Sequence, residues 1–291
     1  MGCIKGAVDY YEMDTSVPAL FGLTSHAFLI NLHGTLCPSS PYVWNHEEFF
    51  RLLSGLGIKR TASVMRRKDA TASEIQEAQE RVMAHLRAGQ VCMMDYLEHQ
   101  LISGYDEKGF LFLKPWNCMS PSELPALTFG TWEECLAREG WVQFTLLSKS
   151  GTRRDFKAQL KDSLSVALSM FAHPEPFQVP EYRIGFGAWE TWLGQVKKGA
   201  GAEHGHWWNA TVWSECRTMA GDFFREVDPL LPPGARKTAA DLSAAYKEMG
   251  TLLFEAREKT LPAAEQVPRL EKCLERERQA VGLLEELAAA L

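Results

Sequence analysis

The sequence predicts an α+β protein of two domains, a mixed domain of helices and strands over residues 1–150 and an all-helical domain over residues 151–291. A chain of 291 residues is long enough for two domains of about 100–200 residues each. Short apolar runs bounded by turn residues, which are typical of strands, occur only in the first half. After residues 149–152, apolar residues recur with helical spacing almost to the end of the chain.

The mixed domain begins with a helix. Over positions 3–12 the apolar residues follow the i, i+3, i+4, i+7 spacing of one helical face, at Ile4, Ala7, Val8 and Tyr11. A second short helix is predicted at 17–21, because Pro18 suits a first turn and Gly22 ends the pattern. Residues 28–32 form an apolar run that is typical of a buried strand.

Two capping-box patterns predict the next helices. The first, at 45–48, precedes an apolar helical stripe that ends at Gly57. The second, at 71–74, precedes a stripe that ends at Gly89. The other elements predicted in this domain are strands at 91–95, 99–103, 110–114 and 142–147 and a short helix at 131–138.

The second half of the chain contains helical patterns separated by prolines and glycines. Helices are predicted at 154–171, 185–197, 207–228, 238–259 and 263–290. Because no strand pattern stands out among them, we expect a helix bundle or an orthogonal packing of helices.

Charge and hydropathy exclude several classes of function. The net charge is −6, so there is no overall basic field to hold nucleic acid or an anionic membrane. No run of about 18 apolar residues occurs, so we expect no membrane span. The first fourteen residues lack the apolar region of a secretory signal. We therefore expect a cytoplasmic protein without a nucleic-acid or membrane partner.

The cysteines and short motifs argue against a cofactor or a metal. The seven cysteines are widely spaced and include no C-x-x-C pair, so a zinc ribbon or a thioredoxin-like motif is not supported. Reduced thiols fit the cytosol. His204 and His206 have no acidic or cysteine partner at helical spacing, and we interpret them as solvated histidines in a glycine-rich linker. No Walker A, GxSxG or GxGxxG motif occurs.

Cys3 is the candidate nucleophile. A thiol at a helix amino terminus lies near the positive end of the helix dipole, and the backbone N–H groups there can support a thiolate or an oxyanion. The alternative is that Cys3 is a small apolar residue that packs beside Ile4.

His99 is the candidate base, since an adjacent imidazole would form an ion pair with the thiolate. It begins a predicted strand, and Glu98 precedes it. Adjacent residues of a strand point to opposite faces, so one of these two side chains faces the cleft, and the sequence does not decide which. The alternative for His99 is a surface residue on an edge strand.

Three segments of the chain resemble a known superfamily: Cys3–Tyr11, Leu20–Phe28 and Glu98–Asp106. The first opens a helix with a cysteine, the second carries Phe-Gly-Leu and Ala-Phe, and the third has Gly-Tyr-Asp just beyond a histidine. Together they resemble the papain-like superfamily of bacteriocin-leader peptidases, most of all the N-terminal domain of the butirosin-biosynthesis acyltransferase family. The resemblance covers roughly residues 3–147. The helical half is similar to the C-terminal regions of bacterial proteins of this group.

The resemblance implies a papain-like domain with an N-terminal helix and an antiparallel sheet. It implies that Cys3 is the nucleophile and His99 the base. In papain-like folds the residue that orients the histidine stands on the following strand or just after it, a role that Asn117 would fill. The resemblance also places the segment with His26 and His33 near the site, where both could line the cleft.

Two departures from the family pattern leave the activity open. The peptidase relatives usually carry the histidine one residue further from the glycine of the turn, where this chain has Glu98. They also have an Asp before a Pro on the following strand, where this chain has Lys114 and Pro115. The third catalytic residue is therefore undecided, and members that have lost catalysis are an alternative.

The leading expectation is a thiol-dependent amide hydrolase or acyltransferase that acts on a small-molecule or peptide acyl substrate and needs no cofactor. The first alternative is a catalytically inactive papain-like protein that binds a small molecule or a peptide. The second is an assembly protein whose helical half forms a homodimer.

Overall fold

The computed structural model describes residues 1–96, 98–113, 129, 132 and 140–291. They form two compact units, which we describe separately. The sheet unit comprises Met1–Thr15 and Ser54–Arg153, and the helical unit comprises Ser16–Leu53 and Arg154–Leu291.

The division differs from the predicted one in a single segment. The sequence pattern predicts residues 16–53 in the mixed domain, whereas they lie in the helical unit. The contact that explains this is at Gly22, where an added Cβ would lie 2.2 Å from the Phe223 ring. The α2 backbone therefore packs into the same core as Phe223, 201 positions later, and local sequence patterns carry no sign of so distant a contact.

The sheet unit contains a five-stranded antiparallel sheet with helices, so the mixed helix-and-sheet class is confirmed. In spatial order the strands are β2 (Ile58–Arg67), β6 (Trp141–Lys149), β3 (Val91–Tyr96), β4 (Glu98–Tyr105) and β5 (Phe110–Leu113). The predicted strands at 91–95, 99–103, 110–114 and 142–147 correspond to β3, β4, β5 and β6. The predicted helix at 131–138 lies outside the described residues apart from Trp132.

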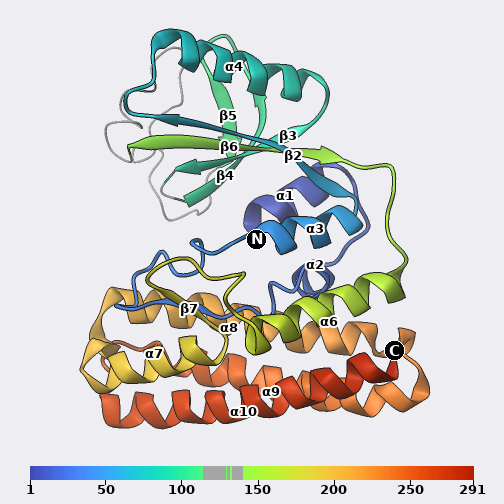
Figure 1. Ribbon diagram of the computed structural model, residues 1–291, viewed down its shortest axis with the longest axis vertical. Coiled ribbons are helices and arrows are strands. Elements are labelled where there is room, and N and C mark those ends of the chain that lie inside the picture. Colours follow the sequence, from blue (N-terminus) through green and yellow to red (C-terminus); the bar gives the residue numbers. More distant parts are fainter. Residues whose placement is uncertain (97, 114–128, 130–131, 133–139) are drawn as a thin grey trace. The chain divides into compact units, whose positions relative to one another are not determined.

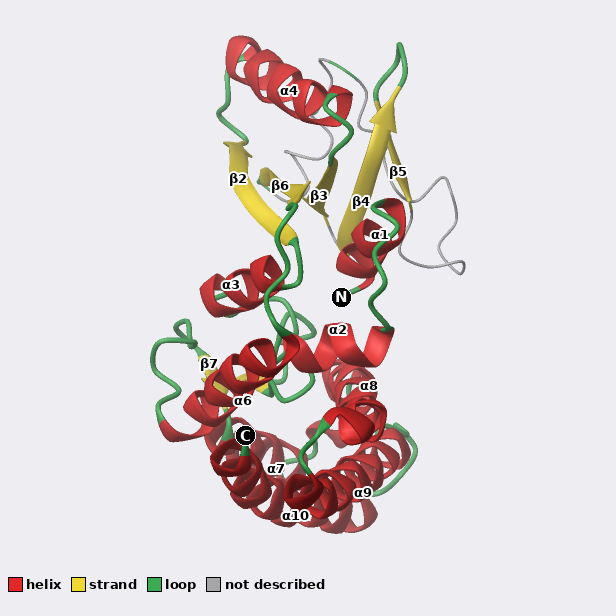
Figure 2. Ribbon diagram, turned by 90° about the vertical axis from the view of Figure 1, so that its right-hand side faces the viewer, coloured by secondary structure: helices red, strands yellow, loops and turns green. Residues whose placement is uncertain are grey.

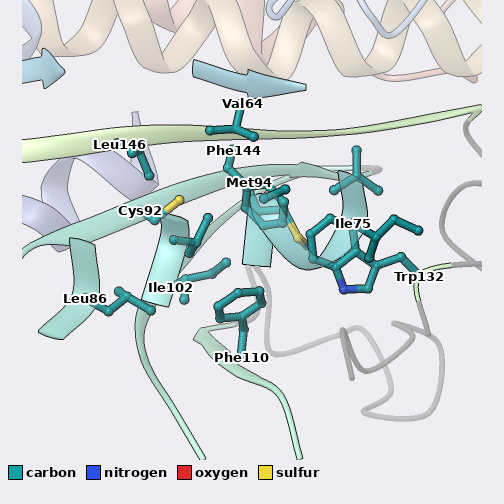
Figure 3. Packing of buried hydrophobic residues seen from close by; sticks show 13 residues of the cluster. Val64, Ile75, Leu86, Cys92, Met94, Ile102, Phe110, Trp132, Phe144 and Leu146 are labelled. Atoms are coloured by element: carbon teal, nitrogen blue, oxygen red, sulfur yellow. The ribbon is translucent and has the colours of Figure 1, made fainter. Parts of the chain in front are cut away.

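Helix α4 (Ala72–Arg87) covers one face of the sheet and α1 (Gly2–Tyr10) packs on the other (Figures 1 and 2). The capping box predicted before α4 is present, because Thr71 and Glu74 exchange side-chain and backbone hydrogen bonds. Alternate residues of β2, β3 and β6 meet α4 in an apolar core that includes Val64, Met94 and Phe144 (Figure 3). The intervening residues of these strands therefore face α1.

The helical unit is built around long helices. Its helices are α2 (Val17–Leu23), α3 (Glu47–Gly55, whose last residues enter the sheet unit), α6 (Phe156–Ala172), α7 (Phe186–Lys197), α8 (His204–Val227), α9 (Pro233–Ala256) and α10 (Ala263–Ala290). Short 3₁₀ turns lie at Ala200–Ala202 and Asp228–Leu230. Two short strands, β1 (Asn31–His33) and β7 (Tyr182–Ile184), pair antiparallel. The second half of the chain is therefore not purely helical as predicted, since it contributes β7.

A buried ion pair holds the core of the helical unit together. Arg217 on α8 and Glu277 on α10 are fully buried, and the guanidinium Nη2 lies 2.5 Å from the carboxylate. Arg217 also donates to the backbone carbonyls of Ala27 and Leu29, and Trp189 on α7 donates to the same carboxylate. Three helices and the segment before β1 therefore share one polar network. Among the described residues, no helix is both long enough and apolar enough to span a bilayer.

Candidate functional site

Helix α1 is fixed to the sheet at its carboxyl end by Tyr11. The buried hydroxyl accepts a hydrogen bond from the Val91 N–H at 3.0 Å and donates to the Leu147 carbonyl at 2.8 Å. Burial is the main reason why the pKa of Tyr11 rises to about 12. The hydroxyl therefore stays protonated at any physiological pH and keeps both bonds.

A second contact lies one and a half turns earlier, at Gly6. A Cβ at this position would lie 2.7 Å from Leu101 Cδ2, so the helix backbone rests directly on this β4 side chain. Leu101 is opposite Met93 in the β3–β4 register. From Tyr11 to Gly6 the helix advances about 7.5 Å, and from Val91 to Met93 the strand advances about 7 Å. The helix thus runs along β3 in the opposite direction to the strand.

Continued toward its amino end, α1 follows the same course along the sheet from Gly6 to Cys3. Three residues advance the helix by about 4.5 Å, and the next sheet position beyond Leu101 on this face is His99, about 7 Å along β4. The amino end of α1, with Cys3 as its second residue, is therefore directed toward the sheet position that His99 and its cross-strand partner Asp95 occupy.

Cys3 is a thiol that is 8% exposed. It lies in the first turn of α1, where backbone N–H groups have no intrahelical acceptor and the helix dipole is positive. The pKa of the neighbouring Cys92 thiol is raised well above its usual value, mainly by burial and further by Asp95 and Cys3. Cys92 therefore lies within electrostatic range of both Cys3 and Asp95, which agrees with the course of α1.

Asp95 and His99 form a close pair across the β3–β4 hairpin. They are opposite each other in the register, and His99 Nδ1 is hydrogen-bonded to Asp95 Oδ1. Their side chains are 14% and 30% exposed, respectively. Because the carboxylate accepts the Nδ1 proton, Nε2 is the nitrogen that can act as a base. Asp95 is a functional candidate that the sequence analysis missed.

The other predicted site residues on β4 and beyond it are only partly described. His99 lies on the face of the sheet that meets α1, because Leu101, two residues later, contacts Gly6. Glu98 is opposite Tyr96 in the register, and its side chain lies outside the described residues. Asn117, predicted to orient the imidazole, also lies outside the described residues.

His26 and His33 belong to the helical unit, whereas Cys3 and His99 belong to the sheet unit. His26 is packed among the rings of Phe21, Trp44 and Phe49, and burial is the main reason why its pKa lies well below the usual value. His33 Nδ1 contacts the Thr35 hydroxyl, and Nε2 lies 3.6 Å from Glu181. Their predicted position in a cleft with Cys3 stays a prediction.

The interpretation of His206 as a solvated linker residue is wrong. His206 lies in α8 and is fully buried; Trp192 Nε1 donates to its Nδ1, and its Nε2 donates to the Ala256 carbonyl. His204 is the exposed first residue of the same helix. Within the described ranges, no group of three or more histidine, cysteine or acidic side chains is arranged to hold a metal ion.

A scan against models of protein families and a search of curated proteins gave no match to this chain. The candidate functional residues are Cys3, His99 and Asp95 of the sheet unit.

Proposed function

We propose that the sheet unit is a papain-like acyl-transfer module in which Cys3 is the nucleophile, His99 the general base and acid, and Asp95 the residue that orients the imidazole. The observation that supports this most directly is the Asp95–His99 pair, which lies on the face of the sheet along which α1 directs Cys3. A thiol at a helix start and a carboxylate-held imidazole are the parts that thiol-dependent acyl transfer requires.

In the first half of the reaction, His99 Nε2 takes the proton of the Cys3 thiol. The thiolate sulfur attacks the acyl carbonyl and forms a tetrahedral intermediate, whose oxyanion the first-turn N–H groups of α1 stabilise. The intermediate collapses, the bond to the leaving amine breaks, and His99 gives its proton to that amine. The product is a thioester on Cys3 and a free amine.

In the second half, water or an acceptor amine attacks the thioester. His99 takes the proton of this nucleophile, and the carbon–sulfur bond breaks. The Cys3 sulfur leaves as a thiolate and is protonated again by the imidazolium. Water yields a hydrolase, and an amine yields an acyltransferase. Asp95 stabilises the imidazolium in both halves, since it is the charge nearest to Nδ1.

Asp95 resolves a difficulty that the family pattern raises. The sequence has Lys114 and Pro115 where relatives carry Asp and Pro. A carboxylate from the preceding strand, paired with His99 across the hairpin, performs the same orienting task. Under this proposal Asp95 takes the role that the sequence analysis assigns to Asn117.

The alternative is a papain-like protein that binds an acyl compound without transforming it. The observation that favours it is the low exposure of Cys3, at 8%. A thiol that stays covered could not reach a carbonyl, and the site would then only bind.

The test is alkylation by iodoacetamide, with each cysteine followed by peptide mass spectrometry. Cys37 is the reference thiol, because it is the one cysteine among those described that is not buried. We expect Cys3 to react at least about tenfold faster than Cys37 at pH 7, and the advantage to disappear in His99→Ala. The variant Cys37→Ser is the matched control and leaves the rate at Cys3 unchanged. Equal reactivity at Cys3 and Cys37, or no effect of His99→Ala, would favour the binding protein.

A further inference from the structure

One row of residues crosses the sheet on the face that meets α1. In the register, His99 on β4 is opposite Asp95 on β3, Asp95 is opposite Gln143 on β6, and Gln143 is opposite Met65 on β2. The row therefore leads from the proposed catalytic pair to the edge strand of the sheet. Its course lies entirely within the sheet unit.

The orientation of this row follows from the opposite face. Val64 and Phe144 lie in the core beneath α4 (Figure 3), and Val142 belongs to the same core. Since side chains alternate along a strand, Met65 and Gln143 face away from α4. The next row on the same face pairs Arg67 with Trp141.

Helix α1 covers only part of this face. Behind Cys3, toward Tyr11, the sheet residues are buried, and their exposed fractions are Val91 0%, Met93 9%, Leu101 3% and Leu147 0%. In the His99 row and the row beyond it, the exposed fraction rises to 44% at Met65 and 37% at Trp141. Two large apolar side chains therefore lie accessible on the sheet surface next to the proposed site. A single exposed apolar residue is ordinary, but two such residues, one in the His99 row and one in the row beyond it, form a surface fit for an apolar group.

Arg67 adds a positive charge at the far corner of this surface. Its side chain is exposed, and no carboxylate pairs with it in the part of the chain that the structure describes. The preceding residue, Arg66, differs from Arg67 because it lies on the other face of the sheet and has partners there. Its Nε donates to the Glu74 carbonyl, and its Nη2 lies 3.8 Å from the Glu77 carboxylate. Arg66 therefore helps to hold β2 to α4. The five N–H donors of the Arg67 guanidinium have no partner among the described residues and can bind another acceptor.

We propose that this surface, made of Gln143, Met65, Trp141 and Arg67, binds the acyl part of the substrate and selects an acyl group with an apolar body and a carboxylate at its far end. The inference rests on the proposed function, because it places the reacting carbonyl at Cys3. The apolar body lies on Trp141 and Met65, and the carboxylate pairs with the Arg67 guanidinium, whose fork matches two carboxylate oxygens.

The register gives the length of this acyl group. Gln143 lies two strand spacings from His99, about 10 Å. The backbone of Arg67 lies three spacings across and two residues along, about 16 Å from that of His99. The guanidinium stands at the end of a long, flexible side chain, which can bring it to a carboxylate on the order of 10 Å from the reacting carbonyl. A dicarboxylic half-amide of medium length has this size, and 4-acetamidobenzoate comes near it from its methyl carbon to its carboxylate.

The experiment compares three electrophiles at Cys3. They are iodoacetamide, 4-(chloroacetamido)benzoate and its neutral analogue 4-(chloroacetamido)benzamide. In each reaction the Cys3 thiolate forms a bond to the methylene carbon and a halide ion leaves with the bonding electrons. We expect the benzoate to saturate and to react at least about tenfold faster than the benzamide at low concentration, because tenfold corresponds to one charge-assisted contact.

The variants Arg67→Gln and Trp141→Ala test the two halves of the surface. Arg67→Gln removes the preference for the benzoate over the benzamide, and Trp141→Ala slows both aryl probes but not iodoacetamide. The matched control is Lys59→Gln, which removes an exposed cation from the other end of β2. Equal rates for the two aryl probes, or the same effect of Arg67→Gln and Lys59→Gln, would overturn the inference.

A binding measurement separates this inference from the proposed function. Calorimetric titration of the Cys3→Ser protein with 4-acetamidobenzoate needs no reactive thiol. We expect binding that Arg67→Gln weakens at least about tenfold and Lys59→Gln does not. If iodoacetamide finds no reactive Cys3 but this binding is present, the chemistry is wrong and the surface stands. If Cys3 is reactive but binding is absent, only the surface is wrong.

Discussion

Asp95 and His99 are opposite each other on β3 and β4, and the Asp95 carboxylate accepts the hydrogen of His99 Nδ1. This one cross-strand pair fixes the tautomer of the imidazole and the face of the sheet on which the proposed chemistry takes place. In the proposed function it orients the base that acts on Cys3.

Removal of the Asp95 charge should weaken the base. In Asp95→Asn the neutral amide offers no negative charge to an imidazolium at Nδ1, so the proposed thiolate–imidazolium pair with Cys3 is destabilised. We expect the pH profile of Cys3 alkylation to move up by about 1–2 units. Asp69→Asn, which neutralises an exposed carboxylate of the same unit, should leave the profile unchanged. A profile that Asp95→Asn does not move would leave Asp95 with a structural role only.

The contact between Gly6 and Leu101 should control the reactivity of Cys3. In Gly6→Ala the new methyl group would lie 2.7 Å from Leu101 Cδ2, so the Leu101 side chain or α1 must shift. We expect a loss of about 1–3 kcal/mol in the free energy of unfolding and a slower alkylation of Cys3. Gly151→Ala is the control, since a Cβ there meets nothing within 4 Å.

A second substitution distinguishes strain from a general loss of fold. Leu101→Ala makes room for the methyl group, so the pair Gly6→Ala and Leu101→Ala should cost less than the sum of the two single changes. The free energies of unfolding are measured by denaturant titration. If the losses of the two single variants simply add up in the double variant, α1 does not pack on Leu101 at Gly6.

The stability of the helical unit should fall in mild acid because of His206. Burial lowers the pKa of His206, and Trp192 already donates to the nitrogen that a second proton would occupy. The unfolded chain has the higher pKa, about 6.5, and therefore binds protons first. The stabilisation is complete above pH 6.5 and is lost as pH falls from there through the folded pKa.

His206→Gln tests this, because glutamine can accept from Trp192 and donate to Ala256 without titrating. We expect the loss of stability between pH 7 and pH 5 to shrink by about 1 kcal/mol or more, as thermal unfolding would measure. Part of the pH dependence of stability should remain in this variant, because the pKa of His26 is also lowered. The control is His173→Gln, which replaces an exposed histidine and should leave the pH dependence of stability unchanged. An unchanged pH dependence in His206→Gln would refute this explanation.

Local patterns were sufficient for many elements of this fold. Helix α4 follows from its apolar spacing and from the capping box of Thr71 and Glu74, which need no distant partner. Strands β3, β4 and β6 follow from short apolar runs, because each is buried by the sheet around it. Cys3 at the start of α1 was predicted for the same reason, since an amphipathic stripe fixes where that helix begins.

Strand β2 was missed because it lies at an edge. Six of its ten residues are polar or basic, and only Ile58 and Val64 are buried. Edge strands use such residues to avoid pairing with other chains, so they lack the apolar run that identifies a strand. The surface proposed for the acyl group depends on Met65 and Arg67, and it could therefore not be predicted from the sequence.

Asp95 and His206 were missed because their partners lie across space. Asp95 is four positions from His99, and only the register of the hairpin brings the two side chains together. His206 is next to Gly205, which suggests a flexible linker. In the structure a Cβ at Gly205 would lie 2.1 Å from the Leu36 carbonyl, so this glycine permits a close approach of two backbones.

The proposed chemistry requires that Cys3 and His99 form a thiolate–imidazolium pair. It is tested most directly by titrating the ultraviolet absorption of the thiolate in the wild-type protein, with Cys3→Ser subtracted as the blank. We expect a thiolate that persists well below the reference pKa of about 8.5 and disappears in His99→Ala. A Cys3 that titrates at or above that reference, with or without His99, would contradict it.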